Sequence, residues 1–296
     1  MRIKPLNPPT HFFRPILFLE MASWNLLRRC QTSCSSALTS SLRASKVGGG
    51  FPFALLPQRC FASSPPDTKL YEWRTYHLKP DTVPQYIAMC DETAALRKKL
   101  NPALLAFFQV ETGGNVNEVR HLYCFDSISH RAEIRAGGAA NAEWRDFLKN
   151  SLPFVASMKS ELFTSSAECH AAAKSVHPQN FQPANDGPGF YEMRSYQLIL
   201  GYNPVPKLYD AFASGLPAKV AADPTGGQLA FLGASEVGTL NQVVELWRYK
   251  SWEDMLTARQ AARPVQAWRD TIGTVAPMVQ HFDTSALKPW AFSPWQ

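Results

Sequence analysis

Residues that could hold a ligand occur twice in this sequence, at the same spacing. The stretch YEWRTYHLKP begins at Tyr71, and the stretch YEMRSYQLIL begins at Tyr191. In each stretch a glutamate, an arginine and a tyrosine occupy alternate positions, so an extended backbone places their side chains on one face of a strand. The six residues are Glu72, Arg74, Tyr76, Glu192, Arg194 and Tyr196. They are the first candidates for a binding pocket.

Two interpretations of this Glu-Arg-Tyr face are open. In the first, the face lines a polar pocket in which the arginine clamps an anionic or quinone-like ligand. In the second, the glutamate and arginine form an ion pair, copied with the repeat, that fixes how two sheets dock. Helices pack against the apolar face of a sheet, so we expect the Glu-Arg-Tyr face to look toward the other sheet.

Two histidines near these stretches are further candidates for the pocket. His77 lies in the first stretch on the opposite strand face, and His121 lies on a later predicted strand, on the same face as Val119 and Tyr123. A histidine in either place could bind a metal or a haem iron. Neither has a second ligand at diagnostic spacing, so the alternative is a hydrogen-bonded histidine in the core or at its rim. The sequence therefore predicts no metal site and no bound cofactor.

The common local signatures of catalysis do not occur in the sequence. No GxGxxG follows a predicted strand, and GxxxxGK[ST], GxSxG and HExxH are all missing. Cys90, Cys124 and Cys169 are widely separated and lack paired metal spacing, which suits buried thiols in a reducing compartment. We assign no catalytic residue and favour a protein that is not an enzyme.

The body of the chain contains an internal sequence repeat that extends well beyond the two opening stretches. The segment Asn117-Glu118-Val119 matches Asn241-Gln242-Val243, and Trp144-Arg145 matches Trp268-Arg269, at an offset of 124 residues. The opening stretches are offset by 120 residues, so the second copy contains four additional residues in its loops. Many matches in the same order indicate a duplicated structural unit.

Each copy is predicted to have the order β-α-β-β-α-β, the ferredoxin-like split unit. In the first copy we expect strands near 70–79, 104–111, 116–125 and 155–165, and helices over 84–100 and 127–150. In the second copy we expect strands near 189–200, 227–236, 240–249 and 278–286, and helices over 204–221 and 251–272. Two such sheets could close into an eight-stranded barrel. The predicted fold is therefore α+β, with tandem repeats in a dimeric-α/β-barrel-type arrangement.

The predicted domain boundaries follow from the repeat and from composition. Residues 1–66 form a leader, 67–166 the first repeat and 189–286 the second repeat. Prolines, glycines and polar residues between the repeats indicate a linker over 167–188, and 287–296 form a C-terminal tail.

Positive charge is concentrated at the start of the chain. Residues 1–61 contain eight Lys or Arg and one acidic residue, which leaves 22 basic and 23 acidic residues in the remainder. That remainder gives no charge-based argument for nucleic-acid binding. A leader rich in Arg, Ser and Thr and nearly free of acid is typical of a mitochondrial transit peptide. No apolar run approaches the roughly 20 residues of a membrane-spanning helix.

The quoted motifs resemble those of the NipSnap family. YEWRTYHLKP, HLYCF, HRAEIR, the Trp-Arg pair before LPFV and the second YEMRSYQL carry the resemblance, which covers about 68–296. HRAEIRAGGAANAEW and the FSPWQ end are most similar to the third subgroup of the family. The resemblance implies tandem dimeric-α/β-barrel domains and residence in the mitochondrial matrix or the cytosol. It implies no catalytic residue, since none is established for the family.

The resemblance also implies two functional hypotheses. Relatives in this family recruit autophagy adaptors to damaged mitochondria, which predicts a non-enzymatic interaction protein linked to mitochondrial quality control. Its partners would be autophagy adaptors, other mitochondrial proteins or further copies of itself. The alternative is a binder of haem or a quinone-like molecule, or a cofactor-free monooxygenase that uses the barrel pocket, by analogy with other proteins of this fold.

Overall fold

The computed structural model describes residues 69–296, and the predicted leader at 1–66 lies outside this range. The first half contains β1 (Leu70–Leu78), α1 (Val83–Glu92), α2 (Ala94–Leu100), β2 (Leu104–Thr112), β3 (Glu118–Phe125), α3 (Ile128–Ala140), α4 (Ala142–Ser151) and β4 (Val155–Ser165). After the short helix α5 (Ala167–Ala172), the second half contains β5 (Phe190–Leu198), α6 (Pro204–Ala222), β6 (Gln228–Val237), β7 (Gln242–Tyr249), α7 (Trp252–Ala262), α8 (Gln266–Val275) and β8 (Val279–Pro289).

The predicted β-α-β-β-α-β order is confirmed in both halves, but three of the four predicted helices are divided in two. The first breaks at Thr93, the second at Asn141, and the fourth between Ala262 and Gln266. Asn141 shows why, because its side-chain oxygen accepts a hydrogen bond from the backbone N–H of Trp144 at 2.8 Å and begins a new helix. In contrast, α6 runs unbroken for 19 residues.

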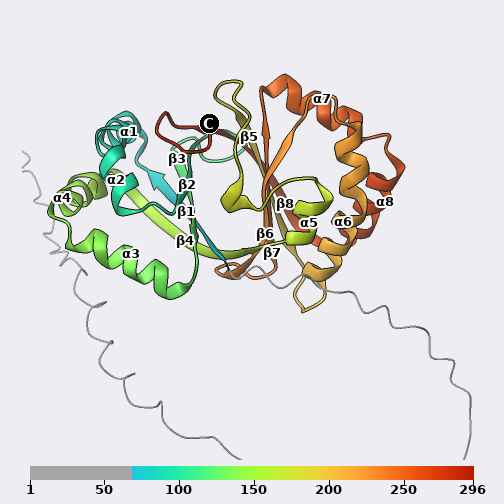
Figure 1. Ribbon diagram of the computed structural model, residues 1–296, viewed down its shortest axis with the longest axis horizontal. Coiled ribbons are helices and arrows are strands. Elements are labelled where there is room, and N and C mark those ends of the chain that lie inside the picture. The colour runs from blue at the N-terminus through green and yellow to red at the C-terminus, as the bar shows by residue number, and fades with distance from the viewer. Residues whose placement is uncertain (1–68) are drawn as a thin grey trace, which may run out of the picture. The chain divides into compact units, whose positions relative to one another are not determined.

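The eight strands form one closed barrel, as the sequence predicted. Their order around the barrel is β1-β3-β2-β8-β5-β7-β6-β4, with antiparallel pairing throughout. The two half-barrels meet edge to edge, where β2 pairs with β8 and β4 pairs with β6. Helices α1–α4 cover the outside of the first half, and α6–α8 cover the outside of the second half (Figure 1).

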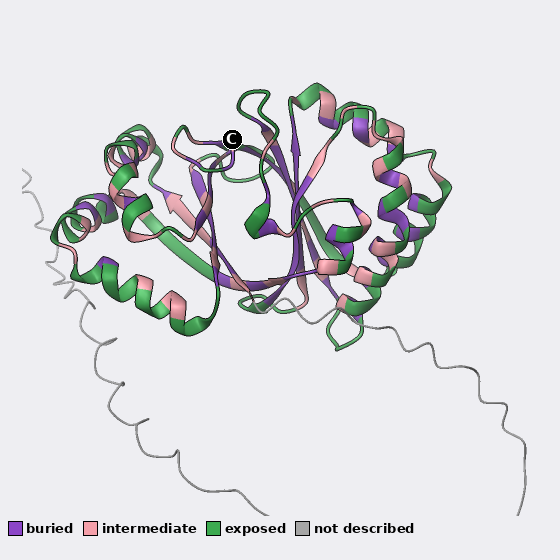
Figure 2. Cartoon of the chain, viewed as in Figure 1, coloured by how far each residue is buried: buried purple, intermediate pink, exposed green. Residues whose placement is uncertain are grey.

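Large apolar side chains fill much of the interior of the barrel. Tyr71, Trp73, Phe108, Phe231 and Leu287 belong to one buried cluster inside it. Figure 2 shows long buried stretches on the central strands of the barrel, whereas β4 and β8 are exposed over part of their length. An eight-stranded barrel is just wide enough for side chains to fill. The alternate residues of each strand must therefore point outward, toward the helices.

This arrangement contradicts the expected orientation of the Glu-Arg-Tyr face. Tyr71 and Trp73 point into the barrel, so Glu72 and Arg74 point out toward α1–α4. The expectation failed because the two sheets join at their edges and share an aromatic core. The ion pairs consequently lie beneath the helices and cannot hold the two sheets together.

The segments after each repeat pack against the barrel. Phe181, within the predicted linker, and Trp295, near the end of the chain, are both buried in the barrel cluster, with ring centroids 4.9 Å apart. Arg248 of β7 connects the same two segments, since its guanidinium donates to the carbonyl oxygens of Ala184 and Gln296. Among residues 69–296, no helix has the length and apolar character to cross a membrane.

Candidate functional site

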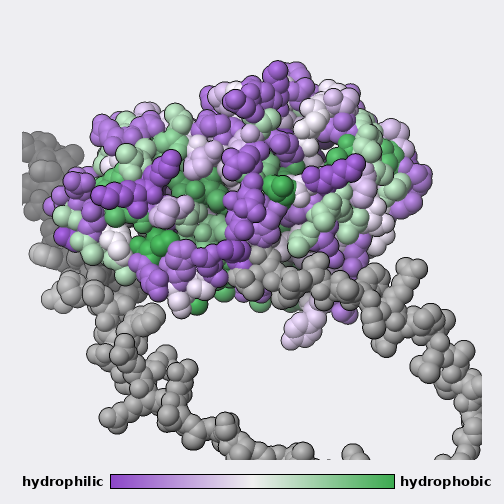
Figure 3. Space-filling view, viewed as in Figure 1, coloured by the Kyte–Doolittle hydropathy of each residue, from purple (hydrophilic) through white to green (hydrophobic). Residues whose placement is uncertain are grey.

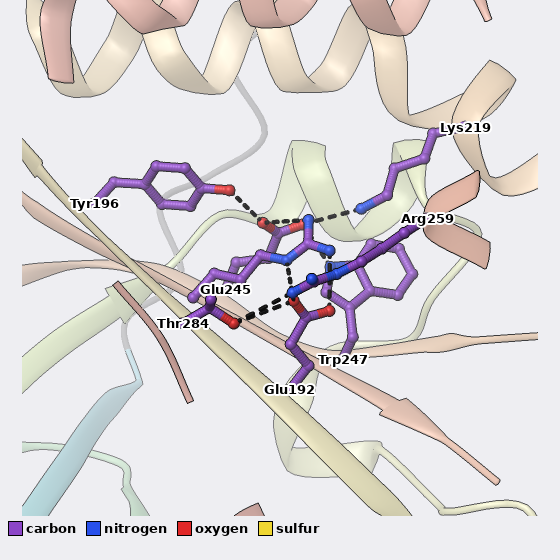
Figure 4. Close-up of polar contacts among 8 residues, drawn as sticks. Glu192, Tyr196, Lys219, Glu245, Trp247, Arg259 and Thr284 are labelled. Atoms are coloured by element: carbon purple, nitrogen blue, oxygen red, sulfur yellow. Dashed lines mark hydrogen bonds and ion pairs between the residues drawn. The ribbon is translucent and has the colours of Figure 1, made fainter. Parts of the chain in front are cut away.

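In the second half, the Glu-Arg-Tyr face is a fully paired charge cluster (Figure 4). Arg194 donates two hydrogen bonds to Glu192, at 2.8 and 2.9 Å. Arg259 of α7 also pairs with Glu192, whose carboxylate further accepts from Thr284 at 3.3 Å. Glu192 is only 2% exposed, so this fork of donors compensates for its lost hydration.

A second carboxylate, Glu245 of β7, completes that cluster. Its Oε2 accepts a hydrogen bond from the Tyr196 hydroxyl at 2.8 Å, and its Oε1 accepts from Lys219 of α6 at 3.2 Å. The indole N–H of Trp247 donates to Oε1 as well. Burial opposes ionisation of Glu245, but the charges of Lys219 and Arg194 outweigh it and lower its pKa to about 2.

In the first half, Glu72 is held in the same way as Glu192. Arg74 donates to it at 2.9 Å, Arg131 of α3 at 2.6 Å and Ser160 of β4 at 2.5 Å. Burial opposes the charge of Glu72, but the hydrogen bonds from Arg131 and Arg74 prevail and lower its pKa to about 2. The ion-pair interpretation of the strand motif therefore describes Glu72 and Arg74 correctly, although on the outer face of the barrel.

The two halves differ at the residue opposite this arginine on the neighbouring strand. Arg74 pairs in register with His121 of β3, whereas Arg194 pairs with Glu245 of β7. His121 is stacked 4.2 Å from the Phe107 ring, and it is 1% exposed. Burial, and then the charges of Arg97 and Arg74, hold the pKa of His121 well below its usual range. The first half thus has a neutral ring where the second half has a carboxylate.

The largest difference in charge pairing concerns Arg97 of α2. Its guanidinium lies over the rings of Trp144 at 5.0 Å and Phe147 at 5.4 Å, and it donates to the Cys90 sulfur at 3.7 Å. It is 5% exposed, and among the described residues it forms no ion pair with a carboxylate. Its Nε has no hydrogen-bond partner, and the same is true of the Nε atoms of Arg74 and Arg131. Buried guanidinium groups are usually paired, so this is a site with unused donors.

Each half has a cavity between its strands and its helices. The first-half pocket has a volume of about 320 Å³ and is lined by Arg74, Tyr76, Tyr86, Arg97, Tyr123, Arg135, Trp144 and Phe147, among others. The second-half pocket has a volume of about 270 Å³ and is lined by Arg194, Lys219, Asp223, Trp247, Arg259, Arg263 and Trp268, among others. In Figure 3, hydrophobic side chains show between α3 and the strands of the first half, framed by hydrophilic ones.

The two pockets are similar in size, but the charged residues that line them differ. Three arginines and no acidic residue line the first-half pocket. Four cations line the second-half pocket, but Asp223 lines it too, and Glu192 and Glu245 pair with its cations from behind. The neighbouring charges also act on Arg135, whose pKa is lowered by burial and by repulsion from Arg74 and Arg131. In the first half, Glu72 pairs with Arg74 from behind, but Arg97 and Arg135 have no acidic partner among the described residues, so the first-half pocket has an excess of positive charge.

The packing of the helices also differs between the two halves. In the second half, α6 meets α8 at Gly215, where an added Cβ would lie 2.1 Å from the Thr271 hydroxyl oxygen. By the repeat offsets of 122 and 124 residues, the first half has Thr93 and Phe147 at these positions. Thr93 lies at the break between α1 and α2. Tyr86 of α1, Arg97 of α2 and Phe147 of α4 line the first-half pocket.

His77 lies apart from the other candidates. It is on the strand face that points into the barrel, where it lines a different cavity of about 370 Å³ with Thr75 and Arg120. Its ring lies 3.3 Å from Glu118 and 3.2 Å from Asn115. The structure therefore brings Tyr76 and His121 together, with ring centroids 4.8 Å apart, but separates His77 from them. No group of three potential metal ligands occurs among residues 69–296.

Sequence reasoning missed Arg97, Lys219 and Arg131. Arg97 is followed by Lys98 and Lys99 in a short helix, a pattern that is typical of a solvated face. Arg131 donates a hydrogen bond to the buried Glu72. The repeat held the missing signal, because Arg97 and Lys219 each precede the matched loop residues Asn101 and Asp223 by four positions.

The fold and its paired pockets define a fused dimeric-α/β-barrel protein, in which two ferredoxin-like halves complete one barrel. The sequence model of the NIPSNAP family matches residues 71–169 and 191–294, and the chain belongs to this family. It is 31% identical to the human protein NipSnap homolog 3A over 77% of this chain and 83% of that protein. It is 28% identical to mouse NipSnap homolog 3B over 87% of this chain and 98% of that protein. The predicted resemblance to the third subgroup is thereby confirmed.

Solved structures with the same fold have very different sequences. A putative monooxygenase from Fusobacterium nucleatum matches with a TM-score of 0.52 and 11% identity, over 75% of this chain and 92% of that one. A putative monooxygenase from Lactobacillus acidophilus matches with a TM-score of 0.50 and 10% identity, over 75% and 93%. At this level of identity the likeness concerns the fold alone.

Proposed function

We propose that this NipSnap protein binds an anionic small molecule in the first-half pocket. The observation that supports the proposal is the excess of positive charge there, since Arg74 pairs with Glu72 but Arg97 and Arg135 have no acidic partner among the described residues. Arg74, Arg97 and Arg135 line a cavity with no acidic residue, and the Nε atoms of Arg74 and Arg97 have no partner. A guanidinium with free donors in an apolar surrounding gives a strong, charge-assisted bond to an incoming anion.

The other walls of the pocket define the rest of the ligand. Tyr76, Tyr86, Tyr123, Trp144 and Phe147 supply aromatic surface around the arginines. The volume of about 320 Å³ lies at the small end of the range that is typical of small-molecule sites. A compact molecule with an aromatic or apolar body and one anionic group suits this combination. This proposal takes up the ligand-binding alternative of the sequence analysis and requires no bound cofactor and no catalytic residue.

The proposal is tested with matched aromatic probes. The full chain is titrated calorimetrically with 1-naphthoate, 1-naphthalenesulfonate and 1-naphthyl phosphate, and with neutral 1-naphthamide. We expect at least one anion to bind more tightly than the amide by about tenfold or more, because a hydrogen bond to a charged group contributes about 1.5–3 kcal/mol. The Arg97→Gln variant should lose this preference.

The matched control is Arg263→Gln, which removes an exposed arginine that lines the second-half pocket. It changes the net charge of the protein by the same amount and should leave anion binding unchanged. Equal binding of the amide and of all three anions would contradict the proposal. Equal losses in the two variants would also contradict it, since they would show that only net charge matters.

A second candidate function is the interaction role in mitochondrial quality control. It rests on the basic, acid-poor composition of residues 1–61, which supports residence in the mitochondrial matrix. Deleting 1–61 should leave the protein in the cytosol, and continued import would contradict the localisation. Pull-down from depolarised mitochondria should recover autophagy adaptors, and recovery no better than with a control matrix protein would exclude this role.

A further inference from the structure

We infer that the ligand of the first-half pocket carries a carboxylate, and that this group binds the first-half counterparts of the donors that surround the carboxylate of Glu245 in the second half. The inference rests on the proposed function and specifies its ligand class and orientation. In the second half, the carboxylate of Glu245 takes the role of the ligand's anionic group. The first half has no carboxylate at the matching position, where His121 stands. One ligand would then bind per chain.

The strand register places the two positions in equivalent surroundings. His121 stands opposite Arg74 on β3 just as Glu245 stands opposite Arg194 on β7. The tyrosines two residues after these arginines, Tyr76 and Tyr196, lie on the same strand faces. The two halves therefore have equivalent strand positions around the arginine. They differ in that the second half has a carboxylate there and the first half does not.

The donors that hold Glu245 have counterparts in the first half. Glu245 accepts from Tyr196, Lys219 and Trp247. The residues at the matching positions are Tyr76, Arg97 and Tyr123, and all three line the first-half pocket together with Arg74. The Lys219 ammonium lies 3.8 Å from the centre of the Trp247 ring, and the Arg97 guanidinium likewise lies over the Trp144 ring. A carboxylate in the first half thus meets a tyrosine and two guanidinium groups.

A carboxylate fits these donors better than a phosphate or a sulfonate. In the second half, donors reach two oxygens, and the walls around them are aromatic. A planar group with two oxygens has no further polar atom to satisfy. A tetrahedral group brings a third oxygen, for which the donors around Glu245 offer no counterpart in the second half.

His121 takes the strand position of Glu245 without supplying negative charge. Its ring is stacked on Phe107 and tilted against Tyr76. Its Nε2 has no hydrogen-bond partner. A glutamate at this position would supply the missing carboxylate from within the chain, as Glu245 does in the second half. The substitution should therefore compete with a ligand for the same cations.

The test compares His121→Glu with His121→Gln in the full chain, using the same naphthalene probes. We expect 1-naphthoate to bind wild type with one site per chain and to bind more tightly than 1-naphthyl phosphate or 1-naphthalenesulfonate. His121→Glu should weaken naphthoate binding by about tenfold or more, since an internal carboxylate occupies the site. His121→Gln, which is neutral and polar, should stay within about threefold of wild type. Thermal unfolding of both variants verifies that they fold.

The outcomes separate this inference from the proposed function. If wild type prefers phosphate or sulfonate to carboxylate, the ligand class is wrong, although anion binding stands. If folded His121→Glu binds naphthoate as tightly as His121→Gln, the position is wrong, although anion binding stands. If no anion binds better than the amide, the proposed function itself fails. The wild-type selectivity decides the ligand class even if His121→Glu does not fold.

Discussion

The two halves of the barrel carry the same Glu-Arg-Tyr strand beneath their helices, but they neutralise it differently. In the second half, Glu192 and Glu245 pair with Arg194, Lys219 and Arg259 in one closed network. In the first half, Glu72 pairs with Arg74 and Arg131, and the cations Arg97 and Arg135 lie nearby without a described acidic partner. One half is complete by itself, and the other has spare positive charge beside a cavity.

This difference shows that the two halves of a duplicated fold can have different roles. Both halves are required to close the barrel, so neither can be lost without exposing strand edges. One half can nevertheless change its outer surface while the other keeps the charge network that stabilises the fold. Here the change involves few positions, since a carboxylate at Glu245 is replaced by His121, and the tight contact of Gly215 with Thr271 is replaced by larger residues.

The largest expected effect comes from breaking the closed network. Glu245→Gln removes the charge that Lys219 and Arg194 face, and leaves two cations buried without it. Breaking a buried ion pair from one side typically costs about 3–5 kcal/mol in the free energy of unfolding. The matched first-half change, His121→Gln, should cost less than about 2 kcal/mol. Urea unfolding of both variants checks this, and equal losses would contradict the contrast between the halves.

Acid should weaken the feature that both halves share. The pKa of Glu72 is about 2, below its usual value of 4.5, so its ionised form stabilises the fold above about pH 4.5. That contribution, about 3 kcal/mol, is lost as the pH falls from about 4.5 through the folded-state pKa near 2. The gap in unfolding free energy between wild type and Glu72→Gln should therefore shrink from pH 5 to pH 2.5. The exposed Glu133→Gln variant serves as the control, and a constant gap for Glu72→Gln would argue against its ionised role.

Helix packing in the second half gives the next effect. Gly215→Ala places a Cβ 2.1 Å from the Thr271 hydroxyl oxygen, so α6 and α8 must move apart. Overpacking of this kind costs about 1–3 kcal/mol, from which the better helix propensity of alanine subtracts up to about 1 kcal/mol. Gly273→Ala, in α8 with no atom near its added Cβ, should instead stabilise the protein. Thermal unfolding of the pair checks both signs, and a stabilising Gly215→Ala would show that the helices tolerate separation.

The repeat made the fold predictable from the sequence, but it did not predict the pockets. The order of elements and the pairing of Glu72 with Arg74 follow from alternation within one strand. The direction of that face does not follow, because it depends on whether the sheets meet by faces or by edges. Arg97 was missed because its burial results from rings that lie 47 and 50 residues away in the sequence, at Trp144 and Phe147. Such contacts have no local pattern.

The smallest expected effect differs in sign between the halves. Arg135 and Arg259 occupy matching positions, 124 residues apart, but their charges face different neighbours. Arg259 pairs with the buried Glu192, so Arg259→Gln should destabilise the protein by about 1 kcal/mol. Arg135 is exposed and is repelled by Arg74 and Arg131, so Arg135→Gln should stabilise it by a few tenths of a kcal/mol at low salt.

The contrast between Arg135→Gln and Arg259→Gln can be tested further by adding salt and by measuring ligand binding. The gain from Arg135→Gln should fade as salt is added, because screening weakens repulsion between exposed charges. The same variant should bind 1-naphthoate more weakly than wild type, because Arg135 lines the first-half pocket. In a binding site for an anion, we expect a residue such as Arg135 to lower the stability of the empty protein and to raise its affinity for the anion. If Arg135→Gln destabilises the protein as Arg259→Gln does, then the first half neutralises its charges internally as well, and the spare positive charge is not a feature of the folded protein.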